Sequence, residues 1–179
     1  IAGSVAVCEN GNYYNRFYFV HPDGAVQHYD KKHLFTFGGE HKRFTAGTER
    51  VVVNFRGVRI LLEVCYDLRF PVWSRNLGDY DMILYVASWP TPRVDAWSAL
   101  LRARAIENQC YVAGVNRMGT DPACEYSGGS AIIDPYGKTI AECPWSRESA
   151  VSADIDMEAL QAFRKKFPVL DDADPFTLI

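Results

Sequence analysis

Cys65 is the residue of this chain whose surroundings best suit a nucleophile. It ends an apolar run at 60–64 and begins a polar turn that leads to a proline. A turn between a strand and a helix exposes a side chain at the sheet edge and points backbone N–H groups at a bound anion. This position predicts a thiol nucleophile beside an oxyanion hole. A buried structural cysteine is the alternative, which spacing alone slightly favours.

A thiol needs help to ionise at neutral pH, because its ordinary pKa is about 8.5. A base or a nearby cation can supply that help. Lys31 and Lys32 stand at the end of a predicted strand, where an ammonium group can be held near a site. His33 or His41 could form a dyad with the cysteine, and nothing in the spacing selects between them. Each lysine also fits an ordinary solvated surface charge.

The sequence leaves more than one role possible for the acidic residues near these positions. Glu40 lies in a loop rich in glycine and charge, where it could orient a lysine, accept a proton or simply face solvent. Glu63 shares a strand face with Cys65, either as a supporting group or as an edge residue. Arg104 and Glu107 are three residues apart on a predicted helix, so we expect them to form a structural ion pair.

Composition narrows the class of protein. The 179 residues carry a net charge of −3 without a basic stripe, so a nucleic-acid partner is not expected. The apolar runs are shorter than the ~20 residues of a membrane helix. The cysteines are odd in number and form no CxxC pair, so neither a zinc site nor a disulfide framework is expected. We expect no cofactor and a cytoplasmic location, because free thiols fit a reducing compartment.

The elements that must position these residues alternate between strands and helices. Apolar or alternating segments predict strands at 4–8, 14–20, 26–29, 51–55, 58–64, 82–87, 111–115, 130–134, 138–142 and 150–155. Residues 30–49 form a long loop, and loops of that length are usually functional. The segment 171–179 is predicted to be an irregular tail. These elements predict one mixed α/β domain over residues 1–179.

Three helices are expected. One spans 71–77 and begins at a proline. A second spans 95–108, with Asp95 as its N-cap and with Trp97, Leu100, Leu101 and Ile106 on its apolar side. The third is capped by Asp156 and ends near Pro168. The chain starts without methionine inside an apparent strand, so we expect further sequence before residue 1 in the natural protein.

Several segments, in order along the chain, resemble the nitrilase superfamily of carbon–nitrogen hydrolases. These segments are 29–35, 39–47, 64–71, 104–109 with 116–117, and 129–130 with 134–137. One such motif would be weak, whereas five in order from about residue 3 to the end are specific. The amino-acid sequence of segments 89–93, 112–117, 167–168 and 172–176 most resembles the omega-amidase branch of this superfamily.

The resemblance implies a four-layer α-β-β-α sandwich, incomplete at the N-terminus, that pairs through helices into a homodimer. We expect the helix at 95–108 and the C-terminal segment to make that contact. It also implies a Glu–Lys–Cys triad. Cys65 would attack, Lys31 and the backbone N–H of Tyr66 would stabilise the oxyanion, and Glu40 would position Lys31 and the substrate amide. The general-base glutamate of the family has no match in this chain.

The omega-amidase branch implies a small-molecule substrate. The terminal amide of 2-oxoglutaramate or 2-oxosuccinamate would be hydrolysed by water through a cysteine thioester, releasing ammonia. Arg69 and Arg93 are candidates to bind the distal carboxylate, with Trp89 as a wall. Either arginine also fits a surface or dimer ion pair. Another amidase, nitrilase or carbamoylase of the superfamily, or a binding module of the same fold, is the alternative function.

Overall fold

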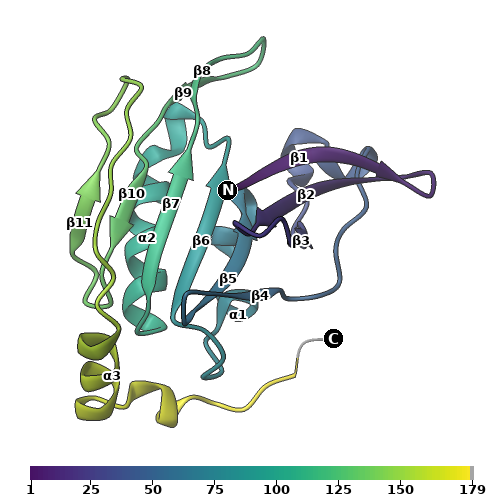
Figure 1. Ribbon diagram of the computed structural model, residues 1–179. Helices are drawn as coiled ribbons and strands as arrows, with labels where there is room; N and C mark the ends of the chain where they lie inside the picture. The colour runs from purple at the N-terminus through teal and green to yellow at the C-terminus, as the bar shows by residue number, and fades with distance from the viewer. Residues whose placement is uncertain (178–179) are drawn as a thin grey trace.

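Two β-sheets organise the chain. The computed structural model describes residues 1–177, so the last two residues of the predicted tail lie outside it. The small sheet has the order β1-β2-β3, the large sheet has the order β11-β10-β7-β6-β5-β4, and β8 pairs with β9 (Figure 1). The strands are β1 (Ala2–Glu9), β2 (Asn12–Val20), β3 (Val26–Asp30), β4 (Val52–Phe55), β5 (Val58–Val64), β6 (Met82–Ala87), β7 (Tyr111–Asn116), β8 (Met118–Thr120), β9 (Glu125–Ser127), β10 (Ala131–Ile133) and β11 (Thr139–Glu142).

The centre of the large sheet brings the site together. Strands β5, β6 and β7 run parallel, with Val64 opposite Val86 and Ala87 opposite Asn116. Parallel strands end at the same edge of a sheet, and ligands of α/β proteins bind at that edge. The residues that follow β5 and β6, Cys65 and Ser88, therefore lie side by side.

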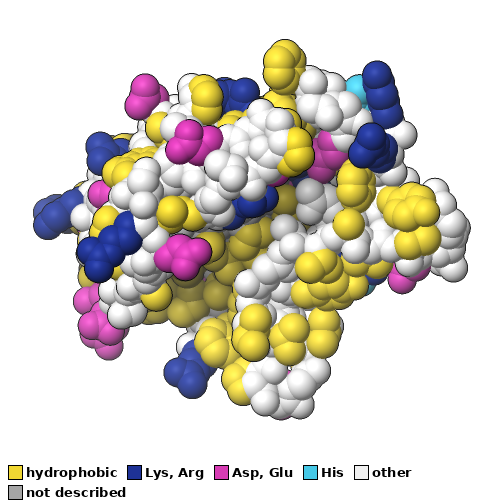
Figure 2. All heavy atoms as spheres, turned by 90° about the horizontal axis from the view of Figure 1, so that it is seen from above, with side chains coloured by type: hydrophobic (Ala, Val, Ile, Leu, Met, Phe, Trp, Pro, Cys, Tyr) yellow, Lys and Arg dark blue, Asp and Glu magenta, His cyan; other side chains and the backbone are white. Residues whose placement is uncertain are grey.

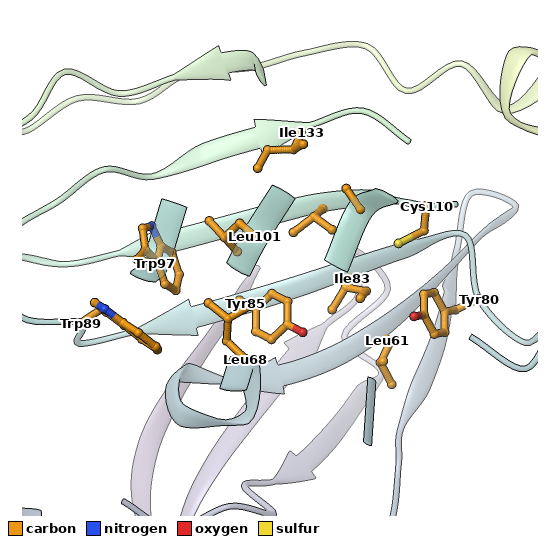
Figure 3. Close-up of a cluster of buried hydrophobic side chains, with 12 residues drawn as sticks. Leu61, Leu68, Tyr80, Ile83, Tyr85, Trp89, Trp97, Leu101, Cys110 and Ile133 are labelled. Atoms are coloured by element: carbon orange, nitrogen blue, oxygen red, sulfur yellow. The ribbon is translucent and has the colours of Figure 1, made fainter. Parts of the chain in front are cut away.

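Helix α2 (Val94–Glu107) packs on one face of the large sheet. The other helices are α1 (Pro71–Ser74) and α3 (Met157–Lys166), and the 3₁₀ turns are η1 (Thr36–Gly38), η2 (Glu40–Lys42), η3 (Cys65–Arg69), η4 (Thr91–Arg93) and η5 (Val169–Asp172). Side chains of α2 meet alternate residues of the strands in a buried cluster that includes Trp97, Leu101, Leu61, Ile83 and Tyr85 (Figure 3). This cluster fixes the strand ends that carry the site.

The small sheet covers the other face. Phe17 and Phe19 of β2 and Tyr29 of β3 form a buried cluster with the remaining alternate residues of β5, including Leu62 and Val64. Strand alternation explains this division, since neighbouring side chains point to opposite faces. Helix, large sheet and small sheet are three consecutive layers of the expected α-β-β-α sandwich.

Buried ion pairs and caps fasten the ends of the helices. Arg104 lies 2.9 Å from Glu107, as predicted, and also donates to the backbone oxygen of Leu68 in η3 at 2.6 Å. Asp156 caps α3 by accepting from the N–H of Ala159 at 2.8 Å, as the sequence predicts.

No helix among residues 1–177 has the length and apolarity that crossing a membrane requires.

The structure corrects several predicted elements. The strand at 150–155 is wrong, because this segment joins no ladder in the described chain and instead runs as an extended connection into α3 (Figure 1). Alternation makes a segment extended, but a strand also needs a partner in register. The short β8–β9 hairpin was not predicted. The long loop at 30–49 contains two 3₁₀ turns.

The predicted helix boundaries also need correction. Arg93, not Asp95, occupies the N-cap of α2, and Asp95 lies in the first turn, where its charge favours the helix dipole. Ile106 was expected on the buried side but is 54% exposed. Helix α1 ends at Ser74, before the predicted 77, because the side chain of Asn76 turns inward and donates to the backbone oxygen of Tyr80.

Candidate active site

A cavity of about 240 Å³ lies at the carboxyl ends of β5 and β6. Its lining includes every residue to which the family resemblance gives a role: Lys31, Glu40, Cys65, Tyr66, Arg69, Trp89 and Arg93. Viewed from above, the molecule is hollowed between the part with the large sheet and the part with the β1–β2 hairpin, and apolar side chains form the floor (Figure 2). The structure thus brings together residues from the small sheet, the loop at 30–49 and two strand ends.

Cys65 has an unusual backbone conformation. Its φ is +49°, a left-handed value that is uncommon for a residue with a side chain. It opens η3 directly after β5, and its Sγ lies 3.8 Å from the backbone oxygen of Ser88. The next N–H, that of Tyr66, is at the N-terminal end of the turn, where backbone donors lack a helical acceptor. The turn thus pairs a partly buried sulfur with a backbone donor.

A buried ion pair lines the same cavity as the sulfur. Lys31 follows β3 directly, is 3% exposed and places Nζ 2.6 Å from Glu40 Oε2. The same oxygen accepts from the N–H of Phe35 at 2.6 Å, and Oε1 accepts from Nδ2 of Asn15 at 3.0 Å. Glycine is required at 47, because a side chain there would collide with the backbone of Asp30 next to the lysine.

The charges of this group act on one another. Burial raises the pKa of the Cys65 thiol above its ordinary value; the Lys31 ammonium opposes burial most strongly, without overcoming it. Burial also pushes the pKa of Glu40 upward, but the Lys31 charge and the hydrogen bonds together bring it below its ordinary value. Glu40 is therefore a carboxylate and Cys65 is mostly a thiol at neutral pH.

One wall of the cavity is aromatic and cationic. The guanidinium of Arg69 lies 5.0 Å from the ring centre of Trp89, and that of Arg93 lies 5.4 Å from the ring centre of Phe35. Among residues 1–177, neither arginine forms an ion pair with a carboxylate. The side chain of Asn116 fixes the wall by binding both backbone groups of Trp89. This wall can accept an anionic group.

Two polar residues at the site were missed by the sequence analysis. Asn15 holds Glu40, and Asn116 holds the loop that carries Trp89. Asparagine is depleted in strands. Its position within an alternating strand (Asn15) or at a strand end (Asn116) was the signal that could have identified both residues.

The predicted histidine alternatives do not reach the cavity. In the described chain His41 is exposed, and His33 binds Asp67 and stacks on Phe70 with ring centres 3.8 Å apart. A Cys–His dyad is therefore not formed. Lys32 also lies outside the lining, with its Nζ 5.2 Å from the ring centre of Trp73.

Glu63 lies beneath the site. It is fully buried and accepts from the hydroxyl of Ser74 at 3.1 Å. Burial, and then the charge of Asp67, raises its pKa to about 8. It faces α1 and α2, away from the cavity, so it supports the packing behind the nucleophile strand. No group of three or more potential metal ligands occurs among residues 1–177.

Comparison with known proteins defines the class. Residues 1–165 match the carbon-nitrogen hydrolase family. The chain belongs to this family and is a hydrolase of carbon–nitrogen bonds. The superfamily and the sandwich fold predicted from the sequence are therefore confirmed.

Individual relatives narrow the resemblance. The chain is 54% identical to Omega-amidase YafV of Escherichia coli (strain K12), over 99% of this chain and 70% of that protein. It is 42% identical to the 2-oxoglutaramate amidase of Bacillus subtilis (strain 168), over 96% and 67%. It also resembles the crystal structure of XC1258 from Xanthomonas campestris, a CN-hydrolase superfamily protein with an arsenic adduct in the active site. That match has a TM-score of 0.96 and 47% identity, and covers 99% of this chain and 70% of that one.

Proposed function

We propose that the protein hydrolyses the terminal amide of a small 2-oxo acid amide, 2-oxoglutaramate or 2-oxosuccinamate, with Cys65 as the nucleophile. One observation carries the proposal: a thiol, a buried Lys31–Glu40 ion pair and two arginines without acidic partners in the described chain line one cavity. The omega-amidase and 2-oxoglutaramate amidase relatives support the same substrate class.

The first chemical step is attack on the amide carbonyl. The sulfur of Cys65 forms a bond to the carbonyl carbon, and the carbonyl π electrons move to oxygen. The Lys31 ammonium and the N–H of Tyr66 stabilise this oxyanion, as fixed donors do most effectively in a site shielded from water. The tetrahedral intermediate then collapses as the C–N bond breaks. The nitrogen takes up the proton that the thiol gave up and leaves as ammonia, so that a thioester remains on Cys65.

Water completes the cycle. It attacks the thioester carbonyl, the C–S bond breaks, and the carboxylic acid leaves while Cys65 regains its proton. Glu40 keeps Lys31 in place in both steps, since its pKa is lowered and its oxygens already accept from three donors. The resemblance assigns the removal of the thiol proton to a family glutamate without a match in this sequence, so no residue here receives that role.

The arginine wall selects the substrate. A 2-oxo acid amide carries an amide at one end and a carboxylate at the other. Arg69 and Arg93 can bind that carboxylate with charge-assisted hydrogen bonds while Trp89 limits the length of the molecule. The cavity volume of about 240 Å³ is below the usual volume of pockets that bind drug-sized ligands, so the cavity suits a small metabolite.

Ammonia release tests the proposal. The full-length protein is incubated with 2-oxoglutaramate, 2-oxosuccinamate and a neutral aliphatic amide of equal length. We expect ammonia from the first two with wild type and none with Cys65→Ala, while Cys124→Ala, a partly exposed cysteine outside the cavity, behaves as wild type. Equal release by wild type and Cys65→Ala would refute the assignment. No release from any amide would favour the binding module.

Homodimer formation, a cytoplasmic location and a single domain over residues 1–179 stay predictions. Sedimentation of the full-length protein tests the first of them.

A further inference from the structure

We propose that Asp67 is a positioning residue that holds Lys31 at the correct distance from Cys65. This inference rests on the proposed function of the same cavity, because it concerns how that catalytic pair is assembled. Asp67 does not line the cavity and would not touch the substrate.

The contacts of Asp67 reach both sides of the pair. Its Oδ1 accepts from the backbone N–H of His33 at 2.9 Å and from the ring Nδ1 of the same residue at 2.8 Å. Its Oδ2 accepts from the hydroxyl of Tyr29 at 2.8 Å and from the N–H of Val64 at 3.0 Å. The donors thus flank Lys31 two residues before and two residues after it, and the fourth donor directly precedes Cys65.

These hydrogen bonds join two separate sheets. Lys31 follows β3 of the small sheet, whereas Cys65 follows β5 of the large sheet, and the two strands are not hydrogen-bonded neighbours. Packing between sheets is set by apolar side chains, which tolerate small sliding movements better than directed hydrogen bonds do. A fully buried carboxylate with four donors is a rigid tie between the two strand ends.

The partners of Asp67 are themselves fixed. The Tyr29 hydroxyl accepts from the N–H of Lys32 at 3.0 Å and from Nε1 of Trp73 at 3.2 Å. The His33 ring stacks on Phe70 at the end of η3 with an interplanar angle of 5°. Neither donor can rotate away from Asp67 without losing these contacts. The position of Asp67 therefore fixes the backbone before and after Lys31.

Charge alone does not explain a carboxylate here. The negative charge of Asp67 is one of the influences that raise the pKa of Cys65, so it works against formation of the thiolate. Its acceptor positions are occupied by four donors, so it is not free to take the thiol proton. Asp67 therefore contributes through geometry. A displacement of about 1 Å in a catalytic group can lower a rate by about 100-fold, so hydrogen bonds that fix the position of Lys31 relative to Cys65 can have a large effect on kcat.

Removal of single donors tests the inference without removing the buried carboxylate. Tyr29→Phe deletes one hydroxyl, and His33→Phe deletes the ring donor while keeping a ring to stack on Phe70. Tyr13→Phe, on an exposed part of β2, is the matched control. For each full-length variant we would measure kcat, KM, the melting temperature and the pH dependence of Cys65 alkylation by iodoacetamide, located by mass spectrometry.

We expect Tyr29→Phe and His33→Phe to lower kcat by about tenfold each with KM within about twofold of wild type. Alkylation of Cys65 should move to higher pH in both variants, because Lys31 no longer lies as close to the sulfur. Tyr13→Phe should match wild type in all four measurements.

A lowered melting temperature with wild-type kcat and wild-type alkylation in both variants would overturn the inference, since Asp67 would then be only structural. The alkylation measurement needs no substrate. An alkylation shift together with no amide hydrolysis by wild type would support the positioning role while refuting the proposed function.

Discussion

Replacing Lys31 with methionine removes the ammonium group of the site and keeps most of the side-chain volume. In the native protein this group lies 2.6 Å from Glu40, with side-chain exposures of 3% and 13% for the two residues. Breaking a buried ion pair from one side typically costs 3–5 kcal/mol; because the Glu40 carboxylate keeps donors from Phe35 and Asn15, we expect the unfolding free energy to fall by about 3 kcal/mol.

The same substitution should impair catalysis more than stability alone explains. Loss of one oxyanion donor lowers kcat by about 10²–10³-fold, and we expect that range for Lys31→Met. Lys31 is also the strongest influence that lowers the pKa of Cys65, so its removal should move alkylation of the thiol to higher pH. Ammonia release, alkylation and thermal unfolding measure the three effects. Lys42→Met is the control, because Lys42 is exposed in the same loop and lies outside the cavity lining.

A second variant separates stability from activity. Lys31→Met combined with Glu40→Gln leaves two neutral side chains, so it should recover most of the lost unfolding free energy and none of the lost kcat. The reasoning fails if Lys31→Met retains kcat within about threefold of wild type, or if alkylation of its Cys65 follows the wild-type pH curve.

Three further predictions follow from the surroundings of the site. Arg69→Leu and Arg93→Leu should each raise KM for 2-oxoglutaramate by about 10–100-fold in steady-state assays, and should leave KM for a neutral amide unchanged. Asn15→Leu leaves one oxygen of Glu40 without its donor, so denaturant unfolding should show a loss of about 1–3 kcal/mol, with kcat lowered more than KM is raised. Glu63 has a raised pKa, so its buried protonated form favours folding at low pH, and this contribution is lost as pH rises from 4.5 toward about 8. Glu63→Gln should therefore flatten the decline in melting temperature over this window, and an unchanged decline would contradict the burial argument.

Local patterns predict the nucleophile strand well. The apolar run before Cys65 and the polar turn after it predict the strand end and the turn that the structure shows, with the sulfur partly buried at their junction. The parallel core follows from the same reasoning, since the fully apolar run of β6 needs layers on both faces. Patterns of this kind depend on near neighbours in the chain, and for that reason sequence reasoning reaches them.

Long-range pairs are harder to predict. From spacing, Lys31, His33 and His41 were equivalent candidates beside Cys65, and only the family resemblance favoured the lysine. The structure shows why spacing does not distinguish them: Lys31 lines the cavity, whereas His33 binds the carboxylate of Asp67 in the turn η3, which follows a strand of the other sheet. Asn15 was missed for the same reason, because its partner Glu40 lies 25 residues away.

The wrong prediction at 150–155 has a different cause. Its alternating pattern is sufficient for an extended segment, and the structure does show an extended connection there. Strand formation further depends on whether an edge with free backbone groups is available in register, and that property belongs to the assembled sheet. Ile106 is exposed for a simpler reason: at about 100° per residue it lies on the side of α2 opposite Trp97, away from the buried residues Leu101 and Ala105.

The left-handed backbone of Cys65 has a consequence for the stability of this protein. An L-residue in that region stores roughly 1–2 kcal/mol of strain that glycine would not. Glycine would in turn lose the packing of the thiol against both buried clusters and would add freedom to the unfolded chain. The turn therefore keeps local strain at the one backbone angle that presents the sulfur, and packing on both sides helps to hold it there.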